Sequence, residues 1–197
     1  MKKTTKVGTI SHKLKIYNQP YVTNNILKTL IEKNAPAYTI AELCKDGIVT
    51  PIKRWKIYIN NRSSHRKDDY VIGSLYFGDE PYVFGGLHVY NLYHFTTQIA
   101  ERYTIYNTTI SGKKIIGNAK FIFKKVRPSF FYGIKTKMIT GRLVNFMSPE
   151  RALIELYKEK ENPEFIKGIP SNIDRIKLTK MAEKYCDKNV LQRIKKI

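Results

Sequence analysis

The 197-residue sequence has little cysteine and no long hydrophobic run. Its two cysteines, Cys44 and Cys186, lie far apart and have no neighbouring cysteine or histidine at metal-ligand spacing, which indicates neither a disulfide framework nor a zinc site. No segment approaches the ~20 consecutive apolar residues of a membrane span, and the lysine-rich N-terminus lacks the apolar core of a secretory signal. We therefore expect a cytoplasmic protein that holds no metal or cofactor and has no membrane partner.

Acidic residues are also scarce, because the chain has 16 aspartates and glutamates against 36 lysines and arginines. The formal net charge is +20 at pH 7, and the sequence pI is about 9.9. This excess disfavours self-association and favours polyanions, nucleic acid before an anionic membrane surface. Hydrophobic residues make up 42% of the chain, which is enough apolar surface for a folded protein.

A polar run at residues 60–67 contains no apolar side chain and suits a linker. Residues 1–67 hold 14 basic and 3 acidic side chains, whereas the longer remainder holds 22 and 13. We predict a DNA-binding domain at residues 1–62, a linker at 63–68 and a second domain at 69–197. The higher charge density of the N-terminal third makes it the first place to expect nucleic-acid recognition.

The N-terminal third has the pattern of three helices followed by a basic hairpin. Apolar spacing, an N-cap at Thr23 and breaks at Pro20 and Pro36 predict helices over 8–18, 24–33 and 36–45. Two short β-branched runs, 48–52 and 55–59, predict strands joined by a turn at 53–54. This order predicts a winged helix-turn-helix, and the alternative is a small helical domain with a solvated basic surface.

The predicted winged helix divides its DNA contacts between two kinds of residue. Basic side chains on the first helix and the wing should neutralise phosphates, which gives affinity with little sequence reading. Outward side chains of the third helix are candidates for base-edge contacts. The predicted phosphate contacts are Lys13, Lys15, Lys53, Arg54 and Lys56, and the predicted base contacts are Tyr38, Thr39, Glu42 and Lys45.

The second part of the chain predicts an α+β domain, with a mostly antiparallel sheet flanked by helices. Helical segments follow Asp68 and residues 85–86, and glycine-punctuated strands are expected at 103–106, 119–123, 134–139 and 143–146. Ser148 and Pro149 begin another helix, and the tail predicts helices at 173–185 and 190–194. In Glu150-Arg151 we expect a helix N-terminal carboxylate with a structural arginine partner rather than a catalytic pair.

Residues 102–149 contain ten basic side chains and no acidic one. One interpretation is a solvated strand surface, and the other is a second basic surface for additional DNA or an anionic partner such as an acidic toxin or an RNA. The residues of this second basic surface are Lys113, Lys114, Lys120, Lys124, Lys125, Arg127, Lys135, Lys137 and Arg142. The shortage of carboxylates leaves a metal-dependent nuclease without ligands, so we predict no catalytic residues and no enzyme.

Several segments, taken in order, make the chain similar to a known family. They follow the predicted winged helix and occupy 74–77, 82–93 (with Phe84-Gly85-Gly86-Leu87), 97–99, 131–133 and 147–153 (Met147-Ser148-Pro149-Glu150-Arg151-Ala152-Leu153). With the hairpin from Gly47 to Tyr58, this order resembles the AbiEi-like antitoxins and transcriptional regulators of type IV toxin–antitoxin (abortive infection) systems. One departure lies at residues 55–58, where the family often has a glycine before the hairpin tyrosine.

The resemblance implies a non-enzymatic antitoxin that represses its own operon. Its partners would be double-stranded DNA, at inverted repeats of its own promoter, and a co-encoded nucleotidyltransferase-like toxin. The protein would be a monomer in solution or would pair on DNA. The alternative function is a winged-helix regulator, or an RNA- or protein-binding module, without a toxin partner.

Overall fold

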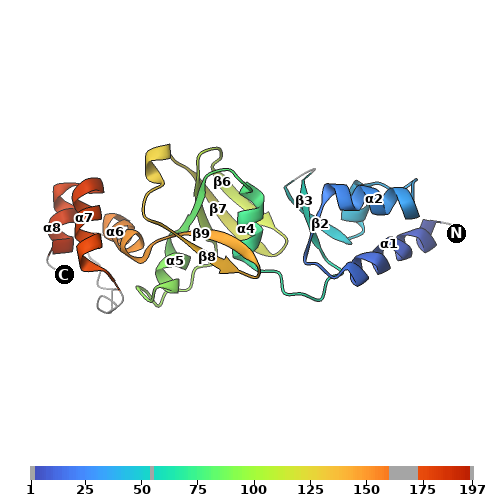
Figure 1. Cartoon of the computed structure of the whole chain (residues 1–197), viewed down its shortest axis with the longest axis horizontal. Coiled ribbons are helices and arrows are strands. Elements are labelled where there is room, and N and C mark those ends of the chain that lie inside the picture. The colour runs from blue at the N-terminus through green and yellow to red at the C-terminus, as the bar shows by residue number, and fades with distance from the viewer. Residues whose placement is uncertain (1–2, 54–55, 160–172, 196–197) are drawn as a thin grey trace. The chain divides into compact units, whose positions relative to one another are not determined.

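The computed structural model describes residues 3–53, 56–159 and 173–195 of the chain (Figure 1). By their internal contacts, the residues group into two compact units. The first unit comprises Met1–Gly78 with Ile115–Ala119, and the second comprises Asp79–Lys114 with Lys120–Ile197. Together they form a mixed α+β fold, as the sequence pattern predicts.

The first unit combines helices with a small antiparallel sheet. Its elements are α1 (Lys3–Tyr17), β1 (Tyr21–Thr23), α2 (Asn24–Asn34), α3 (Ile40–Lys45), β2 (Val49–Lys53), β3 (Ile57–Asn60) and α4 (Asp69–Phe77). The strands pair in the order β1-β3-β2. Strand β1 is an addition to the predicted elements, because its three residues are too short to give a pattern in the sequence.

One hydrophobic core holds these elements together. Ile10 and Leu14 of α1, Leu27 of α2 and Leu43 of α3 are completely buried in it. The spacing of four between Ile10 and Leu14 places both side chains on one side of α1. Burying each such side chain contributes about 1.5–3 kcal/mol, so the helices are fixed mainly by this shared core.

A buried asparagine fixes the end of this unit's sheet. Asn60 is 0% exposed, and its Nδ2 donates to the carbonyl oxygens of Leu14 (2.9 Å) and Gln19 (3.0 Å). Its Oδ1 accepts from the backbone N–H of Arg62 at 3.0 Å. One neutral side chain therefore satisfies polar groups from three segments of the chain.

The residues predicted as a linker are hydrogen-bonded to the first unit. Ser63 Oγ donates to the carbonyl oxygen of Asn18 at 2.7 Å, and the backbone N–H of Asp68 donates to Tyr21 Oη at 3.1 Å. Helix α4 follows and packs against β2. The predicted linker at 63–68 therefore precedes α4, whereas the compact units divide after Gly78.

The second unit is built on a six-stranded sheet. Its elements are β4 (Tyr82–Gly85), α5 (Leu87–Leu92), β5 (Tyr103–Asn107), β6 (Gly112–Ile116), β7 (Ala119–Lys125), the 3₁₀-helix η1 (Pro128–Phe130), β8 (Ile134–Ile139), β9 (Arg142–Met147), α6 (Pro149–Glu159), α7 (Arg175–Tyr185) and α8 (Lys188–Lys195). The strand order is β6-β7-β5-β4-β9-β8. Phe84, Ile105 and Phe146 lie on neighbouring central strands, and all three are buried.

The direction of the strands is mixed. β4 is antiparallel to β5 and β8 is antiparallel to β9, but β5 is parallel to β7 and β4 is parallel to β9. The sequence prediction of a mostly antiparallel sheet did not include these parallel pairings, which join strands separated by other elements along the chain. It also did not include β6, because the exposed Lys113 and Lys114 interrupt the apolar alternation that identifies a strand.

Candidate nucleic-acid interface

Helix α3 begins at a reciprocal cap formed by Thr39 and Glu42. Thr39 Oγ1 accepts from the backbone N–H of Glu42 at 3.2 Å, and Glu42 Oε2 accepts from the backbone N–H of Thr39 at 2.8 Å. This capping box starts the helix at Ile40, four residues later than predicted from Pro36. Both side chains were predicted base contacts, and in this structure they stabilise the helix N-terminus.

Tyr38 connects the two ends of α3. Its hydroxyl donates to Oδ2 of Asp46, the residue that caps the C-terminus of the helix. This hydrogen bond is the main reason that the pKa of Tyr38 is raised to about 12, so the hydroxyl remains protonated at neutral pH. Tyr38, which was also a predicted base contact, is therefore already hydrogen-bonded to the residue that ends α3.

The outward surface of α3 is small and carries one cation. Ala41 and Lys45 are exposed and lie four residues apart on α3, and Ala37 is exposed in the turn before the helix. Two alanines allow close approach of another surface, and Lys45 lies at the C-terminal end of the helix. Ala41 was not among the predicted base contacts.

The hairpin after α3 places its predicted phosphate contacts differently. Lys53 is half-buried, and its Nζ lies 5.7 Å from the ring centroid of Tyr76 in α4. Lys56 is exposed, and its carbonyl oxygen accepts from the backbone N–H of Asn24 at the start of α2. Arg54 lies outside the described residues. Lys56 is therefore the hairpin cation that is both exposed and fixed in position by its backbone.

Helix α1 adds further cations to the first unit. Lys13 and Lys15 are exposed, while Leu14 between them is completely buried. The predicted phosphate contacts on α1 are therefore accessible to solvent.

The structure separates the residues of the predicted second basic surface. Lys113, Lys114, Lys120, Lys124 and Lys125 belong to β6 and β7 at one edge of the sheet, and Lys135, Lys137 and Arg142 belong to β8 and β9 at the other. The uncharged strands β5 and β4 lie between the two groups. Arg127 is exposed in the segment between β7 and η1.

The register also divides these cations between the two faces of the sheet. Lys124 shares a face with Val83, and Lys135 shares a face with Phe84. Since Val83 and Phe84 are consecutive in one strand, their side chains point to opposite faces. The nine residues therefore do not form one continuous surface.

Some of these cations already have partners. Lys120 forms an ion pair with Glu101, which lowers the pKa of that carboxyl. Lys137 Nζ lies 5.2 Å from the ring centroid of Tyr93, and burial, with a smaller contribution from Lys135, lowers its pKa. The two lysines of β6 are exposed, as are Lys124, Lys125, Arg127 and Lys135.

Helix α6 contains buried charges that the sequence pattern paired incorrectly. Glu150 and Arg151 are not partners: Arg151 Nε donates to Glu155 Oε1 at 2.9 Å, and Glu150 Oε2 lies 3.1 Å from Lys177 Nζ. Ser148 Oγ also donates to Glu150 at 2.7 Å. Burial raises the pKa of Glu150, but the hydrogen bonds from Ser148, from its own backbone and from Lys177 outweigh burial and lower it.

The sequence reasoning missed an aromatic stack beside Arg151. The Arg151 guanidinium carbon lies 3.4 Å from the ring centroid of Tyr132, and the ring of Tyr185 stacks against Tyr132 at 3.6 Å with an angle of 8° between planes. These residues come from α6, the segment before β8 and the end of α7. No local motif joins them, so only the tertiary structure brings them together.

Metal sites and membrane-spanning helices are two further possibilities for a basic α+β protein. Among the described residues, no group of three or more histidine, cysteine, aspartate or glutamate side chains could hold a metal ion. Within the same residues, no helix has the length and apolar character required to cross a bilayer. Cys44 and Cys186 are half-buried free thiols, and burial raises the pKa of each.

The chain was compared with known proteins. No family model and no curated protein matches it. The crystal structure of the Rv2827c protein from Mycobacterium tuberculosis is similar over 96% of this chain and 71% of that chain, with a TM-score of 0.54 and 12% sequence identity. At this identity the likeness concerns the fold alone.

Proposed function

We propose that the protein is a DNA-binding antitoxin of a type IV toxin–antitoxin system. It would repress its own operon at inverted repeats of the promoter and counteract a co-encoded nucleotidyltransferase-like toxin without acting as an enzyme. The observation that carries the DNA-binding part is the basic first unit, in which a short capped helix with a small outward surface is followed directly by a hairpin. The antitoxin part rests on the sequence resemblance described above.

In this proposal the first unit is a winged helix-turn-helix. Helices α2 and α3 would be the helix-turn-helix, and β2 with β3 would be the wing. The exposed residues Ala37, Ala41 and Lys45 would enter the major groove, where the alanines permit close approach and Lys45 donates to base edges. Two copies would bind the two halves of an inverted repeat, since a two-fold DNA sequence matches a two-fold pair of proteins.

The exposed cations would have a different task from Lys45. Lys13, Lys15 and Lys56 would contact phosphates, which contributes affinity and salt dependence without sequence reading. Thr39, Glu42 and Tyr38 would act indirectly, because their hydrogen bonds fix the start and the end of α3.

Binding to the duplex upstream of the protein's own gene tests the DNA-binding part. We expect Lys45→Ala to weaken specific binding about ten-fold and to reduce discrimination against an unrelated duplex. Lys56→Ala should lower the slope of log affinity against log salt by about one, with discrimination retained. Lys188→Ala, at an exposed lysine in the second unit, is the matched control. Unchanged binding in both test variants would remove α3 and the wing from the interface.

Co-expression tests the antitoxin part separately. A neighbouring nucleotidyltransferase-like reading frame should arrest growth when expressed alone, and co-expression of this chain should restore growth. Lys45→Ala should still protect, because the family resemblance implies that residues 69–197 carry the antitoxin activity. Failure of the parent chain to restore growth would reject the antitoxin function but would not bear on the proposed DNA binding.

A further inference from the structure

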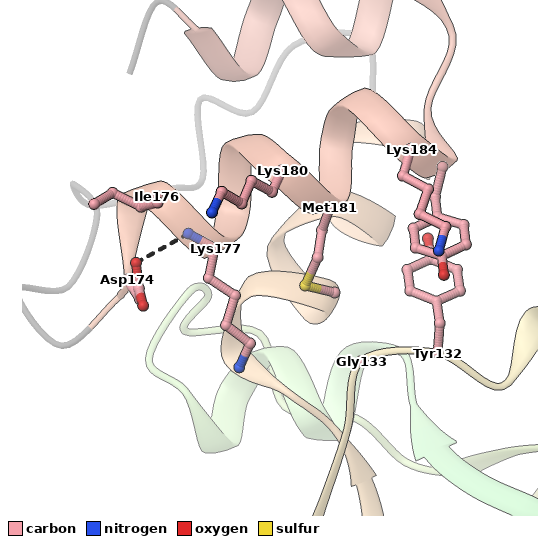
Figure 2. A pocket seen from close by; sticks show the side chains of 9 residues that line it. Tyr132, Gly133, Asp174, Ile176, Lys177, Lys180, Met181 and Lys184 are labelled. Atoms are coloured by element: carbon pink, nitrogen blue, oxygen red, sulfur yellow. Dashed lines mark hydrogen bonds between the residues drawn. The ribbon is translucent and has the colours of Figure 1, made fainter.

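Two cavities of the second unit meet at the Tyr132–Tyr185 stack. One lies between α7 and the segment at Tyr132 and Gly133 and has a volume of about 550 Å³ (Figure 2). The other extends toward η1 and has a volume of about 660 Å³. Tyr132, Tyr185 and Lys184 line both cavities, so the two adjoin at the stack, and we call them together the basic groove.

Gly133 allows α7 to approach the floor of the groove. Its φ is +56°, a conformation that favours glycine, and an added Cβ would lie 2.4 Å from Met181 Cε and 3.0 Å from Arg151 Cβ. Figure 2 shows the Met181 side chain directed from α7 toward this segment. The shape of the groove is therefore fixed by packing between α7 and the residues before β8.

The groove collects cations from several elements. Lys177, Lys180 and Lys184 follow a spacing of three and four along α7, which places them on one side of that helix. Arg127 and Lys158 line the second cavity. The charges therefore continue past the stack instead of surrounding one point.

Part of this charge has no carboxylate partner among the described residues. Lys177 lies 3.1 Å from Glu150, and Lys158 lies 3.2 Å from Glu155. Lys180, Lys184 and Arg127 have no ion pair with a carboxylate of the described residues.

One carboxylate also lines the groove. Asp174 accepts a hydrogen bond from the backbone N–H of Lys177 at 2.9 Å and caps α7 (Figure 2). Asp174 therefore caps the helix, and none of the described carboxylates forms an ion pair with Lys180, Lys184 or Arg127.

The stack supplies a rigid aromatic surface beside these cations. Arg151 occupies one side of the Tyr132 ring and Tyr185 occupies the other. Tyr185 is only half-buried, and its position is set by this stack. Lys184 Nζ lies 5.3 Å from the centroid of the same Tyr185 ring. A base that packs on Tyr185 would therefore share the ring with the Lys184 ammonium, and the stack already orders the ring, which lowers the entropic cost of binding.

We propose that the basic groove binds single-stranded nucleic acid, with phosphates along Lys180, Lys184 and Arg127 and a base against Tyr185. Cations that follow a path, together with an aromatic platform, are the features that bind single strands without sequence preference. A mononucleotide would use one cluster of cations, whereas here they extend through both cavities. An acidic peptide would gain nothing from the aromatic ring. This site is independent of the duplex-binding surface proposed on the first unit.

Fluorescence anisotropy with the full chain tests this inference. The probes are labelled 12-nucleotide poly(U) RNA and poly(dT) DNA, which share the phosphate and base chemistry and distinguish the two natural sources. The double variant Lys180→Ala with Lys184→Ala removes two of the cations on α7. It should weaken binding at least ten-fold and reduce the slope of log affinity against log salt. Tyr185→Leu should weaken binding about ten-fold with the salt slope unchanged. Tyr185→Phe keeps the aromatic ring and should bind with the affinity of the parent.

The control variant removes the same charge elsewhere in the second unit. Lys188→Ala with Lys195→Ala takes two exposed lysines from α8, neither of which lines the groove, and should leave single-strand binding within two-fold of the parent. Equal loss in this control, or no loss in the α7 variant, would overturn the assignment. Displacement of the RNA at a lower concentration of polyglutamate than of unlabelled poly(U) would also overturn it, in favour of an acidic protein partner. Duplex binding should be unchanged in the groove variants, so failure here is distinct from failure of the proposed DNA-binding function.

Discussion

Asn60 in the first unit and Arg151 in the second are both almost fully buried, and both donate to carbonyl oxygens of neighbouring segments. Asn60 is neutral and needs no counter-ion. Arg151 is charged, and its neighbours include Glu155, which is itself buried and bonded to Lys158. A buried charge costs far more to desolvate than an amide, so the second unit depends on complete pairing of its charges. The comparison predicts different responses of the two units to mutation and to acid.

The largest effect should come from breaking the charged network. Arg151→Met removes the donor to Glu155 and to the carbonyl oxygens of Phe130 and Tyr132. Because the Glu155 carboxylate would then be buried with less compensation, we expect a loss of about 3–5 kcal/mol in the free energy of unfolding. Urea denaturation measures this, with the exposed Arg175→Met as control. A loss below about 1 kcal/mol would show that the network is not an important contributor.

Breaking the neutral network should cost less. Asn60→Ala leaves the carbonyl oxygens of Leu14 and Gln19 without their side-chain donor, for which we expect a loss of about 1–3 kcal/mol. The same denaturation measurement applies, with the exposed Asn25→Ala of α2 as control. If Asn60→Ala were as damaging as Arg151→Met, the distinction between neutral and charged networks would fail.

The α3 cap should have a smaller effect on stability and a separate effect on binding. Thr39→Ala removes the side-chain acceptor at the helix N-terminus and should cost about 1 kcal/mol. Thr39→Ser keeps the hydroxyl and should be close to the parent. Duplex affinity should fall in the alanine variant and recover in the serine variant. Loss of affinity in both would assign Thr39 a direct contact instead.

Acid titration of Glu150 should have the smallest effect, because its partner Lys177 is half exposed. The pKa of Glu150 in the folded protein is below its ordinary value of 4.5, so its stabilising contribution is present above that value. The contribution is lost as pH falls from about 4.5 through the lowered pKa. Comparing unfolding at pH 7 and pH 3 for the parent and Glu150→Gln measures it. An identical pH dependence in both proteins would contradict this assignment.

Local patterns predicted much of the first unit. The spacing of Ile10 and Leu14, the cap at Thr23 and the break at Pro20 locate α1 and α2, because helix periodicity and termini are encoded within a few residues. The sequence Thr39-x-x-Glu42 is itself a capping-box signal and could have corrected the start of α3. Polarity alone did not reveal that residues 63–68 form hydrogen bonds to residues more than forty positions away.

The basic groove could not be predicted in the same way. Tyr132, Arg151 and Tyr185 are far apart in the sequence, and their meeting depends on α7 packing beside Gly133. The cations of the predicted second basic surface are divided for a related reason. Alternation locates side chains on one strand, but the strand order and the parallel pairings place Lys124 and Lys135 on opposite faces at opposite edges.

The turn at Ile115–Ala119 has a consequence for how the chain is made. These residues belong to the first unit, where an added Cβ on Gly117 would lie 3.0 Å from Ile59 Cδ1. The first unit is therefore not a continuous stretch of sequence, and its last contacts are synthesised after residues 79–114 of the second. During translation, residues 1–78 leave the ribosome before the turn that completes their packing. The first unit therefore cannot reach its full set of contacts until part of the second unit has been synthesised.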